Sequence, residues 1–121
     1  MIVDEKTALD TTVGGLLRAQ AEADPDRTFV IAEGGERWSY GRVYAESERI
    51  AGGLASIGVR RGDHVVMMLP NGVPFVLVWF ALARLGAVEV PVNPAFRGAS
   101  LEYPVVHSDA TVAIIDGRYR E

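Results

Sequence analysis

Few side chains in this sequence have the types and spacings that perform chemistry. Lys6 is the only lysine and lies in the polar first ten residues, which excludes a catalytic lysine inside a folded body. Cysteine is absent, which removes thiolate nucleophiles, disulfides and cysteine-based zinc sites together. His64 and His107 share no metal-ligand spacing with each other or with a carboxylate pair. We therefore expect neither a catalytic residue nor a metal site in this chain.

Glycine-rich phosphate loops are missing as well. Neither Gly-x-x-x-x-Gly-Lys-Ser/Thr, nor Gly-x-Gly-x-x-Gly, nor Gly-x-Ser-x-Gly occurs. The turn at residues 70–72, Pro-Asn-Gly, follows an apolar strand and precedes a helix, which is where α/β sheets bind ligands and helix amides can hold an anion. With one glycine and no second element, a structural turn is favoured over a local phosphate site.

The other conspicuous side chains have structural interpretations. Glu89 lies in a β-rich run and is interpreted as a solvent-facing carboxylate at a sheet edge, with a buried ion pair to Arg84 as the alternative. Trp79 and Phe80 are interpreted as core residues of an apolar helix, because large aromatic side chains remove much apolar area from water. Asp63 precedes an apolar strand instead of following one, which disfavours a phosphorelay receiver.

Composition and charge narrow the class of protein. The chain has 121 residues, of which 49% are hydrophobic and 23% charged, as expected for one soluble globular domain. The net charge is −4 and no long basic run occurs, so we expect no nucleic-acid partner. The longest apolar run, residues 73–83, falls short of the roughly 20 residues of a membrane span. The first ten residues carry three acidic side chains and no apolar core, so we expect no signal peptide and a cytoplasmic protein.

Two helices and a hairpin are predicted in the first half of the chain. Residues 1–10 are interpreted as a flexible tail, and Thr11 or Thr12 as the cap of a helix that runs to about residue 23. Residues 28–32 and 37–40 flank a Gly-Gly turn and predict two antiparallel strands. A helix follows over about residues 41–57, in which Gly52 and Gly53 are interpreted as room for close packing.

Strands alternate with helices in the second half. Residues 64–69 form a short apolar run that is typical of a strand covered on both faces. Residues 88–92 and 111–115 predict a second and a third strand. A helix over about residues 74–85 and a shorter one over 101–107 separate them, the latter capped by Ser100 and tolerating Pro104 in its first turn. This order predicts an α/β fold: a layered parallel sheet with flanking helices and an N-terminal hairpin, over residues 11–121. Because the strand at residues 111–115 carries no charge, we expect an exposed apolar face or edge.

Four segments in register resemble the beginning of an adenylate-forming enzyme, the superfamily of acyl-CoA synthetases, luciferases and peptide synthetases. They are "ADPDRTFVIAEGGERWSYGRV", "RIAGGLASIGVRRGDHVVMMLPNG", "VPFVLVWFALARLGAVEVPVNP" and "ASLEYPVVHSDATVAIID". The third ends in the Val-Pro-x-Asn-Pro motif and looks more like fatty-acid, carnitine-type or aryl CoA ligases than like peptide-synthetase domains. Departures from the family pattern are Ser39 in place of the commoner Thr, Arg42-Val43 in place of Glu-Leu, and Pro104 in the last helix.

The resemblance implies a parent enzyme that joins a small-molecule carboxylic acid to CoA through an acyl-adenylate, using ATP and Mg2+. It implies that residues 11–121 are an N-terminal α/β subdomain, a fragment of the larger AMP-binding domain. The family's Ser/Thr/Gly-rich loop with Pro-Lys-Gly and its mobile-domain lysine are not in this sequence, and Lys6 matches neither family lysine. We therefore expect this chain alone to be inactive and to bind neither ATP, Mg2+ nor CoA tightly.

One residue takes a possible binding role from the resemblance. Some CoA ligases carry a basic residue just after the Asn-Pro motif, near the CoA phosphates. In this chain Ala95 follows the motif and Arg97 comes two positions later. Arg97 is therefore a candidate contact to the CoA phosphates, with a solvated loop arginine as the alternative. The competing hypothesis for the whole chain is a free-standing α/β binding or assembly module, and a homodimer through the exposed edge or apolar face is open under either hypothesis.

Overall fold

The structure, a computed structural model, describes residues 12–119, so the predicted tail at residues 1–10 lies outside the described range. Helix α2 (Val13–Ala23) starts at Thr12, whose Oγ1 accepts a hydrogen bond from the Gly15 amide at 3.0 Å. The predicted hairpin is formed by β1 (Thr28–Ile31) and β2 (Arg37–Ser39), which pair antiparallel. Helix α3 (Tyr40–Ser56) follows directly, capped by Ser39. The first half therefore confirms the predicted elements within one or two residues.

The second half forms a parallel sheet. Strand β3 (His64–Met68) lies in the centre of the order β4-β3-β5, between β4 (Val88–Pro91) and β5 (Val112–Ile115). Both neighbours run parallel to it. Helix α4 (Val73–Leu85) connects β3 to β4, helix α5 (Ala99–His107) connects β4 to β5, and a short 3-10 helix, η1 (Gly117–Tyr119), follows. The predicted α/β class with a parallel sheet is confirmed.

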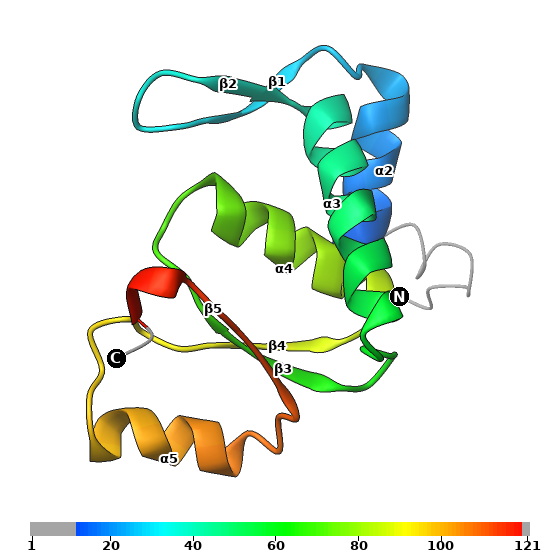
Figure 1. Cartoon of the computed structure of the whole chain (residues 1–121). Helices are drawn as coiled ribbons and strands as arrows, with labels where there is room; N and C mark the ends of the chain where they lie inside the picture. Colours follow the sequence, from blue (N-terminus) through cyan, green and yellow to red (C-terminus); the bar gives the residue numbers. More distant parts are fainter. Residues whose placement is uncertain (1–11, 120–121) are drawn as a thin grey trace, which may run out of the picture.

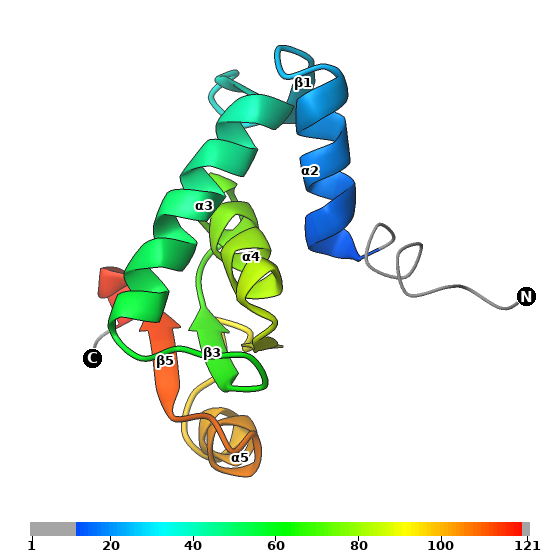
Figure 2. The same cartoon turned by 90° about the vertical axis from the view of Figure 1, so that its right-hand side faces the viewer.

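The two crossover helices cover opposite faces of the sheet. Figures 1 and 2 show α4, beside α3, on one side of the strands and α5 on the other. Right-handed crossovers produce this arrangement when the chain steps from the central strand to one neighbour and then across to the other. The central strand is thereby the best covered: Val65 and Met67 are fully buried, and Val66 and Met68 are buried on the opposite face.

Two adjoining hydrophobic clusters hold these layers together. One joins the α3- and α4-facing side of the sheet to both helices, with the buried residues Val59, Val65, Met67, Leu69, Val78, Leu82 and Ala87. The other joins α2, α3 and α4 to the hairpin through Leu17, Val43, Leu77 and Phe80. The same two helices thus anchor the N-terminal hairpin and the sheet to each other.

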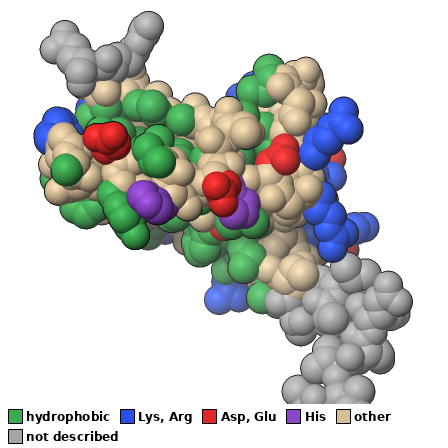
Figure 3. Space-filling model, turned by 90° about the horizontal axis from the view of Figure 1, so that it is seen from below, with side chains coloured by type: hydrophobic (Ala, Val, Ile, Leu, Met, Phe, Trp, Pro, Cys, Tyr) green, Lys and Arg blue, Asp and Glu red, His purple; other side chains and the backbone are tan. Residues whose placement is uncertain are grey.

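The face that carries α5 is open. No residue of α5 is buried, and Tyr103 and Val106 are 66% and 62% exposed. Ile115 at the end of β5 is also exposed. Figure 3, which views the molecule from the α5 side, shows hydrophobic side chains gathered there beside the two histidines. The expected exposed apolar face is confirmed.

Two packing predictions are wrong, the burial of Trp79 and the close packing at Gly52 and Gly53, because packing depends on where neighbouring elements lie. Phe80 is buried as expected, but Trp79 is 41% exposed, since one residue along a helix rotates a side chain by about 100° away from the core. Gly52 and Gly53 do not provide close packing: a Cβ built on either meets no described atom within 4 Å. Both glycines lie on the outer side of α3.

The start of α5 also differs from the prediction. The helix begins at Ala99 after Gly98, which has a φ of 58° and supplies no side-chain cap, so Ser100 is not the cap. Pro104 is consequently the sixth helical residue, beyond the first four whose amides lack partners. Its missing N–H removes one hydrogen bond inside the helix.

The ion-pair alternative for Glu89 is wrong. Arg84 donates through Nη2 to Glu48 Oε1 at 3.0 Å. Glu89 is partly buried on the outer strand β4, where burial raises the pKa of its carboxyl and a hydrogen bond from Trp79 opposes that rise. The predicted position at a sheet edge is confirmed, but the carboxylate is not simply solvent-facing.

Candidate functional site

The carboxyl ends of the three parallel strands meet at one end of the sheet. Three loops follow them: residues 69–72 after β3, residues 92–98 after β4 and residues 116–119 after β5. Figure 1 shows these loops together on the left of the sheet. The strand order reverses here, because the chain steps to one side of β3 and then to the other. This is where open α/β sheets bind ligands.

The first loop contains the predicted turn at residues 70–72. Gly72 has a φ of 155°, which side chains rarely adopt, and begins α4 without a side-chain cap. Pro74 follows in the first helical turn, where its missing N–H costs no helical hydrogen bond. These residues build the predicted turn between β3 and α4.

The second loop holds Arg97, the candidate contact to the CoA phosphates. Asn93 Oδ1 accepts a hydrogen bond from the Ala95 amide at 2.9 Å, which bends the chain just beyond β4. Arg97 Nη1 then donates to the carbonyl oxygens of Pro94 and, at 2.7 Å, Phe96. The guanidinium is exposed and folds back on its own loop.

The third loop carries a carboxylate that is engaged locally. Asp116 Oδ1 accepts from the backbone N–H and from Nε of Arg118, both at 2.9 Å. The backbone hydrogen bond from Arg118 is the main cause that lowers the pKa of this carboxyl. Across residues 12–119 no three His, Cys, Asp or Glu side chains lie close enough together to hold a metal ion.

The histidines and Asp63 lie at the opposite, amino end of the sheet. His64 Nδ1 hydrogen-bonds to the Ser108 carbonyl oxygen, and His107 Nδ1 lies 2.9 Å from the Tyr103 carbonyl oxygen, with its ring stacked on that of Tyr103. Asp63 Oδ2 accepts from the Arg60 amide at 2.8 Å and closes the turn before β3. All three side chains have local structural partners.

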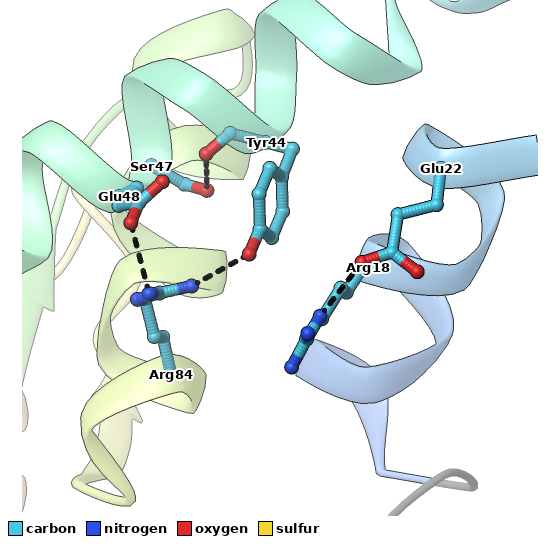
Figure 4. Close-up of polar contacts among 6 residues, drawn as sticks. All are labelled: Arg18, Glu22, Tyr44, Ser47, Glu48 and Arg84. Carbon is cyan, nitrogen blue, oxygen red and sulfur yellow. Dashed lines mark hydrogen bonds and ion pairs between the residues drawn. The ribbon is translucent and has the colours of Figure 1, made fainter. Parts of the chain in front are cut away.

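Sequence reasoning missed a second polar site, which is formed by three helices. A cleft of about 580 Å3 lies between α2, α3 and α4. Arg84 reaches into it from α4, donating at 3.1 Å to the Tyr44 hydroxyl and at 3.0 Å to Glu48, both on α3. Figure 4 shows Arg18, paired with Glu22 on α2, on the other side of this cleft. The only signal in the sequence is a charged residue, Arg84, in an otherwise apolar helix.

The fold and the sites define a class: a parallel α/β unit with an N-terminal hairpin and, among its described residues, no complete catalytic set. Its fold is similar to that of the N-terminal domain of FACL13 from Mycobacterium tuberculosis, with a TM-score of 0.84, 27% identity, and coverage of 90% of this chain and 28% of that one. Residues 17–121 match the AMP-binding enzyme family. The chain belongs to this family.

Curated relatives include an acyl-CoA ligase and an AMP ligase. The mouse mitochondrial medium-chain acyl-CoA ligase ACSF2 is 41% identical over 96 residues, which cover 78% of this chain and 16% of the ligase. The 2,3-dihydroxybenzoate-AMP ligase of Bacillus subtilis is 37% identical over 108 residues, covering 89% and 20%. The chain therefore spans a fifth or less of the length of these relatives. Along residues 12–119 no helix has the length and apolarity needed to span a membrane.

Proposed function

We propose that this chain is the N-terminal scaffold of an acyl-CoA ligase. In the proposed reaction a carboxylate attacks the α-phosphorus of ATP, giving an acyl-adenylate and pyrophosphate. The thiol of CoA then attacks the acyl carbon, a thioester forms and AMP leaves. The observation that carries the proposal is the family match over residues 17–121, together with relatives that are named as acid-activating ligases.

The proposed role of these residues is to form a scaffold that positions the reaction centre. The groups that bind ATP and Mg2+ are proposed to lie in other parts of the polypeptide. Two observations support this division. The only lysine of the sequence is Lys6, and residues 12–119 contain no cluster of metal-ligating side chains. The sheet, in contrast, presents three loops at its carboxyl end, where ligands of α/β folds bind. On its own the 121-residue chain is proposed to be inactive.

Pyrophosphate exchange tests the proposal directly. The 121-residue chain and a longer protein read from the same coding frame are each incubated with ATP, labelled pyrophosphate and a set of fatty and aryl acids. We expect acid-dependent exchange and, with CoA, a thioester only from the longer protein. Exchange by the 121-residue chain alone would overturn the scaffold role. A coding frame with no downstream Ser/Thr/Gly-rich Pro-Lys-Gly loop would overturn the ligase assignment.

Arg97 is proposed as a contact to the CoA phosphates in the longer enzyme. Its exposed guanidinium lies in the loop after β4 and donates through Nη1 to its own loop, and within residues 12–119 Nε and Nη2 have no hydrogen-bond partner. Arg97→Gln is expected to raise the KM for CoA while acid-dependent pyrophosphate exchange, which needs no CoA, stays unchanged. Arg49→Gln, which removes an exposed arginine of α3, is the matched control. An unchanged KM for CoA in Arg97→Gln would assign Arg97 to loop structure.

The alternative function is a free-standing assembly module that forms a homodimer. The open face of α5 and the uncharged edge strand β5 favour it, since an unpaired strand and an apolar face both invite a second copy. Sedimentation of the 121-residue chain at several concentrations tests this. A concentration-dependent dimer that Val106→Glu abolishes would support self-association through this face, and a monomer at high concentration would exclude it.

A further inference from the structure

The turn between β3 and α4 contains an Asn-Gly pair that no other part of the described chain holds in place. Asn71 and Gly72 belong to neither the strand nor the helix, and both are exposed. Among residues 12–119 neither the side-chain amide of Asn71 nor the peptide group that joins it to Gly72 makes a hydrogen bond. This peptide group can therefore rotate without the loss of a hydrogen bond of its own.

The space around Gly72 is open as well. Apart from its chain neighbours, a Cβ built on Gly72 would meet only Pro74 Cδ within 4 Å, at 3.8 Å. Glycine has no Cβ to shield its nitrogen, and its backbone reaches conformations that other residues rarely adopt, as the φ of 155° shows. The Gly72 nitrogen is therefore accessible for ring closure onto the side-chain carbonyl carbon of Asn71, the residue before it.

We propose that Asn71 is a modification site, at which the folded chain converts asparagine to aspartate and isoaspartate through a cyclic imide with the Gly72 nitrogen. The Gly72 nitrogen loses its proton to base and attacks Cγ of Asn71. The bond from Cγ to Nδ2 then breaks, and Nδ2 leaves as ammonia. Water opens the ring: attack at Cγ gives aspartate, and attack at the main-chain carbonyl carbon gives isoaspartate. The net change is the gain of water and the loss of ammonia.

Comparison with two other residues explains why the reaction is expected at Asn71. Asn93 is the other asparagine of the sequence, but it precedes Pro94, which has no N–H to lose. Asp116 precedes a glycine, but its Oδ1 accepts two hydrogen bonds from Arg118, both at 2.9 Å. An ionised carboxylate held in this way is a poor electrophile, because its negative charge repels the attacking nitrogen anion.

Conversion of Asn71 introduces a negative charge into a loop that has none. Residues 69–72 carry no charged side chain, and the first turn of α4 contains no acidic residue. The new carboxylate lies beside the positive end of the α4 dipole. It also lies at the carboxyl end of the sheet, where ligands of α/β folds bind, and changes the charge that a ligand meets there. The inference concerns the 121-residue chain itself and does not depend on the proposed ligase function.

Peptide mapping by mass spectrometry tests the proposal. The folded 121-residue chain is incubated in water labelled with heavy oxygen, at neutral and at mildly alkaline pH, and is then digested with trypsin in ordinary water. Cleavage after arginine gives one peptide, residues 62–84, with Asn71 as its only asparagine, and another, residues 85–97, that contains Asn93. We expect the first peptide to gain labelled oxygen, faster at the higher pH because the Gly72 nitrogen must lose its proton. The second is expected to gain it at least about tenfold more slowly, because Pro94 has no N–H.

Two comparisons separate the contribution of the folded structure from that of the dipeptide. The chain unfolded in guanidinium chloride gives the rate of an unrestrained Asn-Gly pair. The folded chain is expected to react within about tenfold of that rate, because the turn needs no local unfolding before the ring closes. Asn71→Gln is the matched control: it keeps a side-chain amide, but the longer side chain would have to close a larger ring. Its peptide of residues 62–84 is expected to stay unlabelled over the same time.

Each outcome decides for or against the site. Labelling of residues 62–84 in the folded chain, without labelling of residues 85–97 or of Asn71→Gln, supports it. No labelling of the folded chain, or labelling in guanidinium chloride only, would show that the turn prevents ring closure and would overturn the proposal. Equal labelling of the two peptides would show that the reaction does not need the Asn-Gly pair and would overturn it as well.

Discussion

Removing the centre of the α4-to-sheet contact should cost this chain a large part of its stability. Leu82 is fully buried on α4 and packs in the same cluster as Val65 and Met67 of the central strand. Leucine-to-alanine changes at such sites cost about 3–5 kcal/mol, the larger values where surrounding atoms cannot close the cavity. Helix α4 is fixed by α3 on one side and the sheet on the other, so we expect about 4 kcal/mol for Leu82→Ala. The total free energy of unfolding of a domain of this size is about 5–15 kcal/mol, so this single change removes a large part of it.

Leu16→Ala is the matched control, because Leu16 is the same residue type on α2 and is 51% exposed. Urea unfolding followed by circular dichroism at 222 nm measures both variants. With a slope of about 2 kcal/mol per molar urea, Leu82→Ala should lower the midpoint by roughly 2 M, and Leu16→Ala by less than about 0.5 M. Equal losses in the two variants would refute the claim that α4 and the sheet share the dominant core.

Three other substitutions test local features of the structure. Burial raises the pKa of Glu89 above its ordinary value of 4.5, so the stability that its protonated form contributes is complete below about pH 4.5 and is lost as the pH rises through the raised pKa. Glu89→Gln should therefore gain stability relative to the unmodified chain between pH 4.5 and 7, as thermal melts at several pH values would show; a constant difference would contradict the shift. Ser39→Ala removes the cap of α3 and should cost about 1 kcal/mol in urea unfolding, whereas Ser56→Ala, at the other end of the helix, should cost less. Pro104→Ala restores an N–H inside α5 and should raise the free energy of unfolding by about 2 kcal/mol. The helix gains about 3 kcal/mol, and the greater freedom of the unfolded chain takes back up to about 1 kcal/mol. A loss of stability would mean that the proline ring is needed for packing.

Local signals predicted the elements, and tertiary contacts decided what the signals missed. Thr12 caps α2 through its side chain, and Gly86 ends α4 through its left-handed backbone. Both act within one helical turn, so these helix ends can be predicted from nearby residues alone. Gly98 starts α5 with a positive φ and no side-chain hydrogen bond, and no such signal distinguishes it from Ser100 in the sequence. The sequence of α4 is apolar almost all round and predicts a buried Trp79, which the structure shows to be wrong. Which part of that helix faces solvent depends on where α3 and the sheet lie.

For the candidate sites, too, the sequence predicts the position of a residue in the fold but not its side-chain contacts. The position of Arg97 in the loop at the carboxyl end of the sheet follows from strand order alone, since a segment after a parallel strand must lie there. Its hydrogen bonds to Pro94 and Phe96 depend on loop geometry that no motif specifies. The cleft with Arg84 and Tyr44 joins residues 40 positions apart on α4 and α3, and only the packing of these helices brings them together.

Three residues in the segments that resemble the family, Gly62, Asp63 and Gly86, have structural roles. Gly62 has a φ of 86° and donates its amide to the Gly86 carbonyl at 2.9 Å, which ties the turn before β3 to the end of α4. Gly86 has a φ of 71°, which side chains rarely adopt, and a Cβ there would lie 3.0 Å from the Arg61 side chain, so glycine is favoured at this position. Asp63 fixes the same turn by accepting from the Arg60 amide. None of these contacts faces the carboxyl end of the sheet, where a ligand would bind. These residues set the spacing between strand and helix at the amino end of the sheet, away from the end where ligands of α/β folds bind.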